Sequence, residues 1–169
     1  ATGALHEDGL GDVADGFGGG GTQAEKLKIM GDSRIGAYGV LAIVFSVGLR
    51  AALLAGIAGP GLAAAALVAA GAASRGVLPA LMHGLKPVRR GGLAKAAGRP
   101  DKNDAVTAAL LGGLLALLFL PFMAGIAAVI AAGAVAMAFA AFANKQIDGQ
   151  TGDVLGATQQ LTETAVILA

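Results

Sequence analysis

Four carboxylates lie close together near the start of an otherwise apolar chain, at Glu7, Asp8, Asp12 and Asp15. In a helix, at about 100° per residue, Asp8, Asp12 and Asp15 fall within roughly 60° of one another. Like charges at this spacing repel, and each unpaired Asp costs roughly 2.5 to 3.5 kcal/mol at membrane depth, so we expect a cation among them. Because the chain has no cysteine, oxygen ligands predict Mg²⁺, or alternatively Mn²⁺, rather than zinc. The alternative is a solvated acidic face at a helix start, where the helix dipole favours acids.

The composition indicates a membrane protein. Apolar residues make up 56% of the chain, and the mean hydropathy is +0.73, far above the soluble range. Glycine and alanine dominate the apolar stretches while aromatic residues are 4%, which is typical of closely packed transmembrane helices.

The apolar stretches predict the helices that must position the acidic residues. Four of them approach the twenty or so residues that a bilayer requires, with turns at Gly59–Gly61 and Pro121 between them; they cover 37–58, 62–82, 105–120 and 122–143. A further span is expected to begin at Val154. The predicted fold class is therefore all-α, a polytopic membrane helix bundle. We expect one integral membrane domain over 1–169, an excerpt that lacks N-terminal helices and the extreme C-terminus.

Charge distribution predicts the orientation. The loop 83–104 holds half of the chain's Lys and Arg residues, which places it in the cytoplasm by the positive-inside rule; they are Lys86, Arg89, Arg90, Lys95, Arg99 and Lys102. A short helix capped by Thr22 is expected to follow the acidic stretch. Counting spans from the basic loop puts this whole region and the segment 144–153 on the cytoplasmic side of the membrane, like the loop itself. The acidic site is thus expected to face the cytoplasm.

Other polar residues have two interpretations each. Arg50 and Arg75 lie inside predicted spans, where an arginine either pairs with an acid or a substrate phosphate, or snorkels to the interface. The glycines of segment 148–153 allow close approach to a ligand, and Asp153 could join the metal shell, but the same hexapeptide also suits an ordinary loop. His6 is either a hydrogen-bond donor in the outer shell of the metal site, a proton carrier, or structural.

Four motifs together resemble the cobalamin synthase family, the adenosylcobinamide-GDP ribazoletransferases. They are H-E-D-G-L-x-D-x-x-D-G at 6–16, I-M-x-D-S-R-I-G-x-Y-G at 29–39, Ser74-Arg75, and G-Q-T-G-D-x-L-G-A at 149–157. The likeness runs in order over essentially the whole chain. Family members usually begin with additional membrane helices.

The resemblance implies a multi-pass, Mg²⁺-dependent enzyme of the bacterial inner membrane. It would join α-ribazole, or its 5′-phosphate, to adenosylcobinamide-GDP and release GMP. The partners are then these substrates and the bilayer, without nucleic acid and with homo-oligomerisation open. We expect Asp8, Asp12 and Asp15 to be catalytic, Glu7, Asp8, Asp12 and Asp15 to bind metal, and the following residues to bind substrate: His6, Lys28, Asp32, Ser33, Arg34, Arg75, Thr151 and Asp153.

Two other function classes compete. CDP-alcohol phosphotransferases have a similar acidic motif, but they place Ala-Arg after D-G-x-x and use longer spacing between the aspartates, whereas here Asp12 and Asp15 follow Asp8 directly. An ion-coupled transporter would also place acids inside the membrane. No inverted repeat of the acidic motif is present, however, and a purely structural subunit would leave the carboxylate stripe unexplained.

Overall fold

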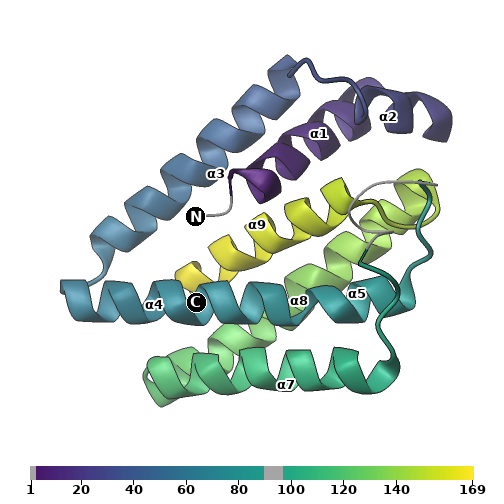
Figure 1. The fold of residues 1–169 in the computed structure, drawn as a ribbon. Helices are drawn as coiled ribbons and strands as arrows, with labels where there is room; N and C mark the ends of the chain where they lie inside the picture. Colours follow the sequence, from purple (N-terminus) through teal and green to yellow (C-terminus); the bar gives the residue numbers. More distant parts are fainter. Residues whose placement is uncertain (1–2, 90–96) are drawn as a thin grey trace.

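The computed structural model describes residues 3–89 and 97–169, which fold into a bundle of helices (Figure 1). This confirms the predicted all-α class, and the only extended pairing in the described residues is an isolated bridge between Pro87 and Gln150. The helices are α1 (Leu5–Gly19), α2 (Gln23–Ile29), α3 (Ala37–Gly56), α4 (Pro60–Gly76), α5 (Leu78–Gly84), α7 (Lys102–Phe119), α8 (Phe122–Ile147) and α9 (Gly152–Leu168).

The predicted membrane-spanning helices are confirmed by length and composition. Four helical stretches of the described residues are long and apolar enough to cross a bilayer: Ala37–Gly56, Pro60–Gly84, Lys102–Phe119 and Phe122–Ile147. The expected fifth span is not among them. Its helix, α9, has 17 residues, and its buried residues include the polar side chains of Thr158, Gln159, Gln160 and Thr162. It therefore serves as an inner element of the bundle.

Tight turns join the spans at the end of the bundle that lies away from the polar segments. Gly59 has φ 92°, a left-handed conformation that glycine adopts without steric cost, and Pro60 then opens α4. Pro121 likewise precedes α8, and its fixed φ suits a helix start.

The three polar segments meet at the opposite end, as the span count predicted (Figure 1). Gln23 of α2 donates to the carbonyl of Ile147 at 2.6 Å, and Lys86 pairs with Asp148 at 2.6 Å. The short α2 begins with the expected cap: Thr22 and Glu25 form a capping box. Of the basic loop, Arg90 and Lys95 lie outside the described residues.

Small residues let the helices approach closely, and large ones face outward. A Cβ on Gly76 of α4 would lie 2.7 Å from the carbonyl oxygen of Ala108, and a Cβ on Gly112 of α7 would lie 2.8 Å from that of Ala72. Close crossings of this kind are typical of membrane helices. Phe45 and Met123 are 70% and 74% exposed, which suits a surface covered by lipid.

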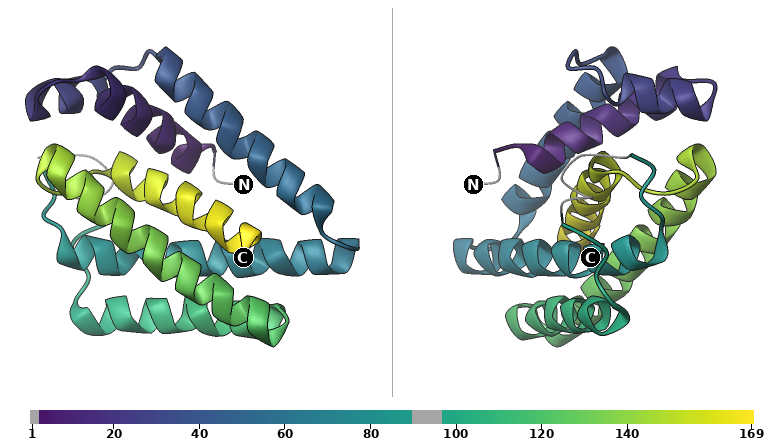
Figure 2. Two further views of the ribbon diagram at one scale, coloured as in Figure 1. Left: turned by 180° about the vertical axis from the view of Figure 1, so that it is seen from behind. Right: turned by 45° about the vertical axis from the view of Figure 1, so that its right-hand side comes forward.

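The helices α1 and α9, which carry the polar residues, complete the core. α9 packs against α1, α4 and α8, and the three views show it enclosed by these elements (Figures 1 and 2). α1 in turn lies between α3 and α9. The acidic stretch on α1 is therefore held against the polar start of α9.

Candidate functional site

Glycines set the crossing of α1 and α9. A Cβ on Gly9 would lie 2.9 Å from the backbone oxygen of Asp153, and a Cβ on Gly156 would lie 3.2 Å from the Cα of His6. A side chain at Gly9 would require the backbones to move apart, and one at Gly156 would be tightly packed, so glycine at these positions allows the close approach of the two helices. The crossing brings the acids of α1 next to Asp153.

Asp8 and Asp12 of α1 and Asp153 of α9 form what we call the acid cluster. Burial, followed by the nearby charges of Asp153 and Asp8, raises the pKa of Asp12 from 3.8 to about 6. Burial is also the main cause that raises the pKa of Asp153, with a smaller contribution from Asp8. The three carboxylates therefore repel one another electrostatically, and their negative charge is incompletely neutralised.

Arg89 is the cation of this cluster, and the sequence did not single it out. Its Nη1 lies 2.8 Å from Asp153 Oδ2, and its Nη2 donates to the carbonyl of Leu27 at 3.3 Å. Arg89 also lowers the pKa of Asp12 and of Asp153, against the larger effect of burial. In the sequence it is one of six cations in a polar loop, and nothing there distinguishes it from the others.

A short backbone pairing places Arg89. Gln150 donates its N–H to the carbonyl of Lys86 at 2.9 Å and accepts from the N–H of Val88 at 3.0 Å. Gly149 makes this possible, because it has φ 153° and any Cβ there would collide with the Lys86 carbonyl. The segment 148–153 is thus a support for the basic loop as well as the start of α9.

The donor set of the acid cluster suits a magnesium ion, although it forms no complete cage. In the described part of the chain, no group of three or more His, Asp or Glu side chains is arranged to hold a metal ion. Mg²⁺, however, usually takes one or two carboxylates and completes its shell with water and substrate phosphates. The pKa values of Asp12 and Asp153 are raised first by burial and then by neighbouring carboxylates, and a divalent cation would favour the charged form of both.

Asp15 shares the acidic stripe of α1, but its carboxylate is turned to α3. Its Oδ2 accepts from the N–H of Gly36 at 2.6 Å, and its Oδ1 accepts from the N–H of Gly39 at 2.9 Å. Both oxygens therefore bind free amides at the start of α3, where the helix dipole also favours a negative charge. Asp15 is 9% exposed, so this contact is a buried link between α1 and α3.

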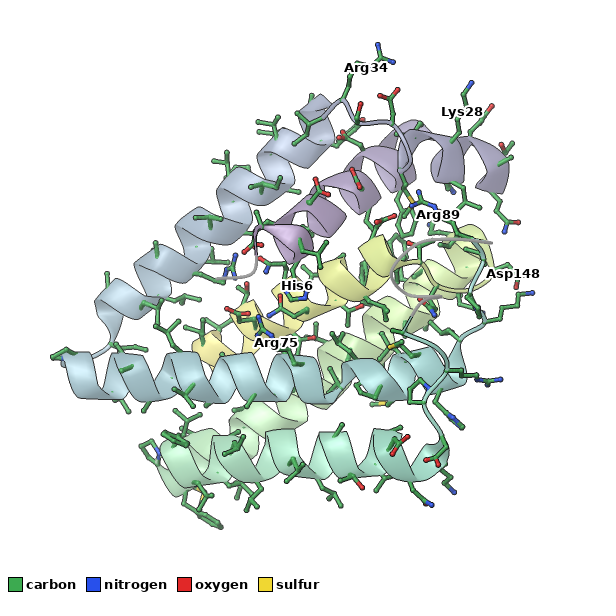
Figure 3. The ribbon with its side chains drawn as sticks, in the orientation of Figure 1. His6, Lys28, Arg34, Arg75, Arg89 and Asp148 are labelled. Carbon is green, nitrogen blue, oxygen red and sulfur yellow. The ribbon has the colours of Figure 1, made fainter. Side chains whose placement is uncertain are left out.

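His6 and Glu7 lie at the N-terminal end of α1, next to the arginines of the spans. Glu7 Oε1 is 3.8 Å from Arg50 Nη2. Burial, then the charge of Arg75, lowers the pKa of His6, and Figure 3 shows His6 and Arg75 facing each other near the middle of the bundle. Arg50 thus pairs with an acidic residue of α1, which is one of the two alternatives that its position in a span allowed.

The four predicted substrate-binding residues between α1 and α3, Lys28, Asp32, Ser33 and Arg34, lie at the surface. Arg34 pairs with Asp32 at 2.7 Å while its side chain is 87% exposed, and its hydrogen bonds lower the pKa of Asp32 to about 2. Ser33 and Lys28 are exposed, and Figure 3 shows Lys28 and Arg34 pointing away from the bundle. The structure does not bring these four residues to the acid cluster.

Thr151 is placed beside the cluster and caps α9. Its Oγ1 accepts from the N–H of Val154 at 3.2 Å and donates to Asp153 Oδ2 at 3.3 Å. It is 2% exposed. Thr151 therefore orients the carboxylate that also binds Arg89.

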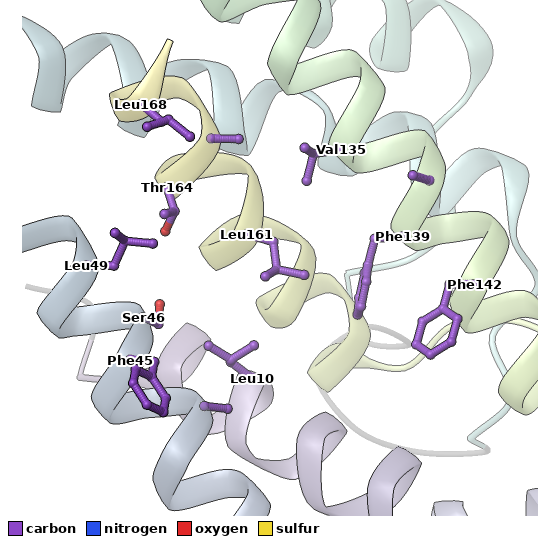
Figure 4. Close-up of a pocket in the computed structure, with 13 residues that line it drawn as sticks. Leu10, Phe45, Ser46, Leu49, Val135, Phe139, Phe142, Leu161, Thr164 and Leu168 are labelled. Carbon is purple, nitrogen blue, oxygen red and sulfur yellow. The ribbon is translucent and has the colours of Figure 1, made fainter. Parts of the chain in front are cut away.

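A separate apolar cavity of about 680 Å³ opens between α1, α3, α8 and α9 (Figure 4). Its walls include Leu10, Phe45, Phe139 and Leu161 and contain no charged side chain. Leu10 is two residues from both Asp8 and Asp12, so its side chain leaves α1 on the opposite side. The cavity is therefore not part of the acid cluster.

Comparison with known proteins identifies the family. The cobalamin-5-phosphate synthase family matches residues 1–169. Among curated proteins, the adenosylcobinamide-GDP ribazoletransferase of Mesorhizobium japonicum is 52% identical over 168 residues, 99% of this chain and 64% of that protein. The enzyme of the same name from Azorhizobium caulinodans is 48% identical over 173 residues, 99% of this chain and 66% of that protein.

The match covers nearly all of this chain, and the chain spans about two thirds of the length of these relatives. No solved structure matches it. The family match extends over residues 1–169 and so includes both the acid cluster and the spans. The chain belongs to the cobalamin-5-phosphate synthase family.

Proposed function

We propose that this chain forms the catalytic part of an adenosylcobinamide-GDP ribazoletransferase. The reaction would join α-ribazole, or its 5′-phosphate, to adenosylcobinamide-GDP, giving adenosylcobalamin or its phosphate and GMP. The observation that carries the proposal is the acid cluster, in which Asp8 and Asp12 meet Asp153 and Arg89 across the glycine crossing. Relatives that share about half of its residues carry this name.

The chemistry would be a phosphoryl transfer. A ribose hydroxyl oxygen that is free in both acceptors, and so not the 5′ oxygen, attacks the phosphorus next to cobinamide. The bond from that phosphorus to the bridging oxygen breaks, GMP leaves with that oxygen, and the hydroxyl proton passes to a base. Negative charge then accumulates on the entering, leaving and equatorial oxygens, so catalysis depends on positioning and on nearby positive charge. Mg²⁺, when bound, would neutralise part of that charge and orient the diphosphate.

The chain's own residues would divide these tasks. Asp8 and Asp153 are the ligands that suit Mg²⁺, and Arg89 can hold a phosphate through its planar fork of N–H donors. Asp12 would accept the proton, because a carboxyl with a pKa of about 6 is close to the value that a general base needs at neutral pH. Asp15, whose oxygens already bind two amides, would support this site through α3.

We also propose the expected location, the bacterial inner membrane with the acid cluster facing the cytoplasm. The end of the bundle that carries α2, the basic loop and the start of α9 would be the cytoplasmic end, in accord with the positive-inside rule. Nucleotide-activated substrates would reach the cluster from that side.

The experiment is a product assay on the purified membrane protein. It is incubated with adenosylcobinamide-GDP, α-ribazole and Mg²⁺, and GMP and the corrinoid product are measured together by mass spectrometry. We expect equal amounts of both, loss of both with a chelator, and loss of both in Asp8→Asn. Asp104→Asn is the matched control, because it removes an exposed carboxylate on α7.

Three outcomes would contradict the proposal. CMP release from CDP-diacylglycerol in place of GMP release would favour the CDP-alcohol phosphotransferase alternative. Ion flux into liposomes without GMP release would favour a transporter. Normal turnover of Asp8→Asn at saturating Mg²⁺ would exclude the metal role of Asp8.

A further inference from the structure

Two arginines and two glutamates from four helices form an ionic network beside the acid cluster. Arg50 Nη1 of α3 lies 3.3 Å from Glu163 Oε1 of α9, and Arg50 Nη2 lies 3.8 Å from Glu7 Oε1 of α1. Arg75 Nη1 of α4 lies 3.7 Å from Glu163 Oε2. The side chains of Arg50 and Glu163 are 13% and 15% exposed, whereas that of Arg75 is 44% exposed, so the Arg50–Glu163 pair is the shielded centre of the network.

Arg50 is the residue that joins α1 to α9 in this network. Its guanidinium contacts a carboxylate from each helix, and its Nε donates to the carbonyl of Ser46 at 3.3 Å, which fixes the side chain along α3. The network contains two positive and two negative charges. Without Arg50, Glu163 would keep only Arg75 and Glu7 would lose its ion pair, and an unpaired charge is costly in apolar surroundings.

Buried amides extend the network but do not replace Arg50. Gln160 donates to Glu7 Oε1 at 3.3 Å and to Gln159 at 2.8 Å, and Gln159 donates to Ser74 Oγ at 3.1 Å. Glu7 Oε2 and Gln160 Oε1 are buried without a hydrogen-bond partner. Gln159 also donates to Glu163 Oε2. The amides therefore hydrogen-bond both carboxylates without neutralising them, and among the described residues Arg50 is the cation that pairs with both.

Both carboxylates held by Arg50 are tied to the acid cluster. Glu7 directly precedes Asp8, and Glu163 lies on the same face of α9 as Asp153, since residues 153, 156, 160 and 163 fall within roughly 80° of one another in a helix. The two ion pairs of Arg50 thus connect the face of α1 and the face of α9 that meet at the glycine crossing. A rotation of either helix would change how far Asp8 and Asp12 lie from Asp153.

We propose that Arg50 is a positioning residue for the acid cluster: by bridging Glu7 and Glu163, it sets the orientation of α1 against α9. It touches no reacting atom in this scheme and acts through the two helices. Its effect on turnover rests on the proposed function, whereas its effect on the helix crossing does not.

The absence of cysteine from this chain allows a direct test with spin labels. Cysteines replace Leu5 on α1 and Leu161 on α9, which are 50% and 36% exposed, and the distance between the labels is measured by pulsed electron paramagnetic resonance. GMP release is measured on the same samples. We expect one narrow distance distribution for the parent and a broadened or shifted one for Arg50→Gln, with kcat lower by about 10- to 100-fold, because small misplacements at a reacting centre have effects of this size.

Further variants separate positioning from loss of folding. Arg50→Lys keeps the charge and should recover part of both the distance distribution and kcat. Arg50→Gln combined with Glu163→Gln keeps the network neutral, so it tests the bridge even where the single variant folds poorly; it should still show the shifted distance and the reduced kcat. Lys102→Gln removes an exposed cation at the start of α7 and should change neither readout.

The outcomes distinguish the two proposals. An unchanged distance distribution in Arg50→Gln and in the double variant shows that Arg50 does not set the helix crossing and overturns the proposal. A shifted distribution with parental kcat shows that the crossing depends on Arg50 but overturns its role as a positioning residue for the acid cluster. If the parent protein itself releases no GMP, the proposed function fails. The label distances then still decide whether Arg50 sets the helix crossing.

Discussion

Arg89 and Asp153 form an ion pair in which Arg89 Nη1 lies 2.8 Å from Asp153 Oδ2. The two residues belong to different polar segments, and the backbone pairing of Gln150 with Lys86 and Val88 brings them together. In the residues that the structure describes, Asp8 and Asp12 have no ion pair of their own, so Arg89 is the nearest source of positive charge for the cluster. A phosphate group entering the site would compete with Asp153 for this guanidinium.

The first prediction concerns Arg89→Gln. We expect the KM for adenosylcobinamide-GDP to rise about tenfold or more, because a charge-assisted hydrogen bond to phosphate contributes about 1.5 to 3 kcal/mol. We also expect half-saturation at lower Mg²⁺, since the variant loses a cation that competes for Asp153. The measurement is steady-state GMP release over a range of both ligands.

Lys86→Gln is the matched control for Arg89. It removes one positive charge from the same segment, but Lys86 pairs with Asp148 and is 65% exposed. Its KM should stay close to that of the parent. An equal increase in KM for both variants would mean that only the general charge of the loop matters.

The second prediction is a pH dependence set by Asp12. Its pKa is raised from 3.8 to about 6, first by burial and then by Asp153 and Asp8, and a base must be unprotonated to accept a proton. The value of kcat/KM should therefore rise with pH, with an inflection near 6, and level off above it. Saturating Mg²⁺ should move the inflection to lower pH, because a nearby cation favours the carboxylate. An unchanged inflection in Asp12→Asn would rule out this assignment.

The raised pKa of Asp12 also predicts how the stability of the protein depends on pH, which shows whether an inactive variant is still folded. Between pH 4 and 6 the folded protein holds the Asp12 proton more tightly than the unfolded chain does, so stability falls as pH rises through this range. Asp12→Asn removes that effect. Its melting temperature should exceed the parent's at pH 7, and the difference should vanish towards pH 4, while turnover is lost at every pH.

The sequence predicted the spans and the acidic stretch because both are local patterns. Hydropathy predicted the ranges of α3, α4, α7 and α8, and helical spacing predicted that Asp8 and Asp12 lie on one side of a helix. It could not predict the partners that come from distant segments, such as Arg89 for Asp153 or Glu163 for Arg50. It also could not show that Asp15, on the same stripe, turns to the amides of Gly36 and Gly39. These contacts depend on how the helices cross, which the glycine positions control.

The third prediction assigns Asp15 a role in holding α3. Asp15→Ala would leave the N–H groups of Gly36 and Gly39 without acceptors in a buried place, at a cost of about 2 kcal/mol or more. The melting temperature in detergent should fall, and Asp15→Asn, which keeps one acceptor oxygen, should fall less. At a temperature where all three proteins are folded, the variants should retain measurable GMP release. Full loss of turnover with a parental melting temperature would instead assign Asp15 to the chemistry.

The fourth prediction tests whether the glycine crossing is required. In Gly9→Ala the new Cβ would lie 2.9 Å from the backbone oxygen of Asp153, and a backbone atom cannot move aside as the end of a flexible side chain can. α1 and α9 must then separate, which moves Asp8 and Asp12 away from Asp153. We expect kcat to fall by about 100-fold, because catalysis is sensitive to displacements of about 1 Å.

Gly48→Ala is the control for this change. It makes the same substitution within α3 at a position where a new Cβ meets no atom within 4 Å. Because alanine favours helix over glycine by about 1 kcal/mol, this variant should be as stable as the parent or slightly more stable, with unchanged kcat. If Gly9→Ala also kept the parental kcat, the close contact of α1 and α9 would not be what assembles the acid cluster, and Asp153 would have to be removed from the proposed site.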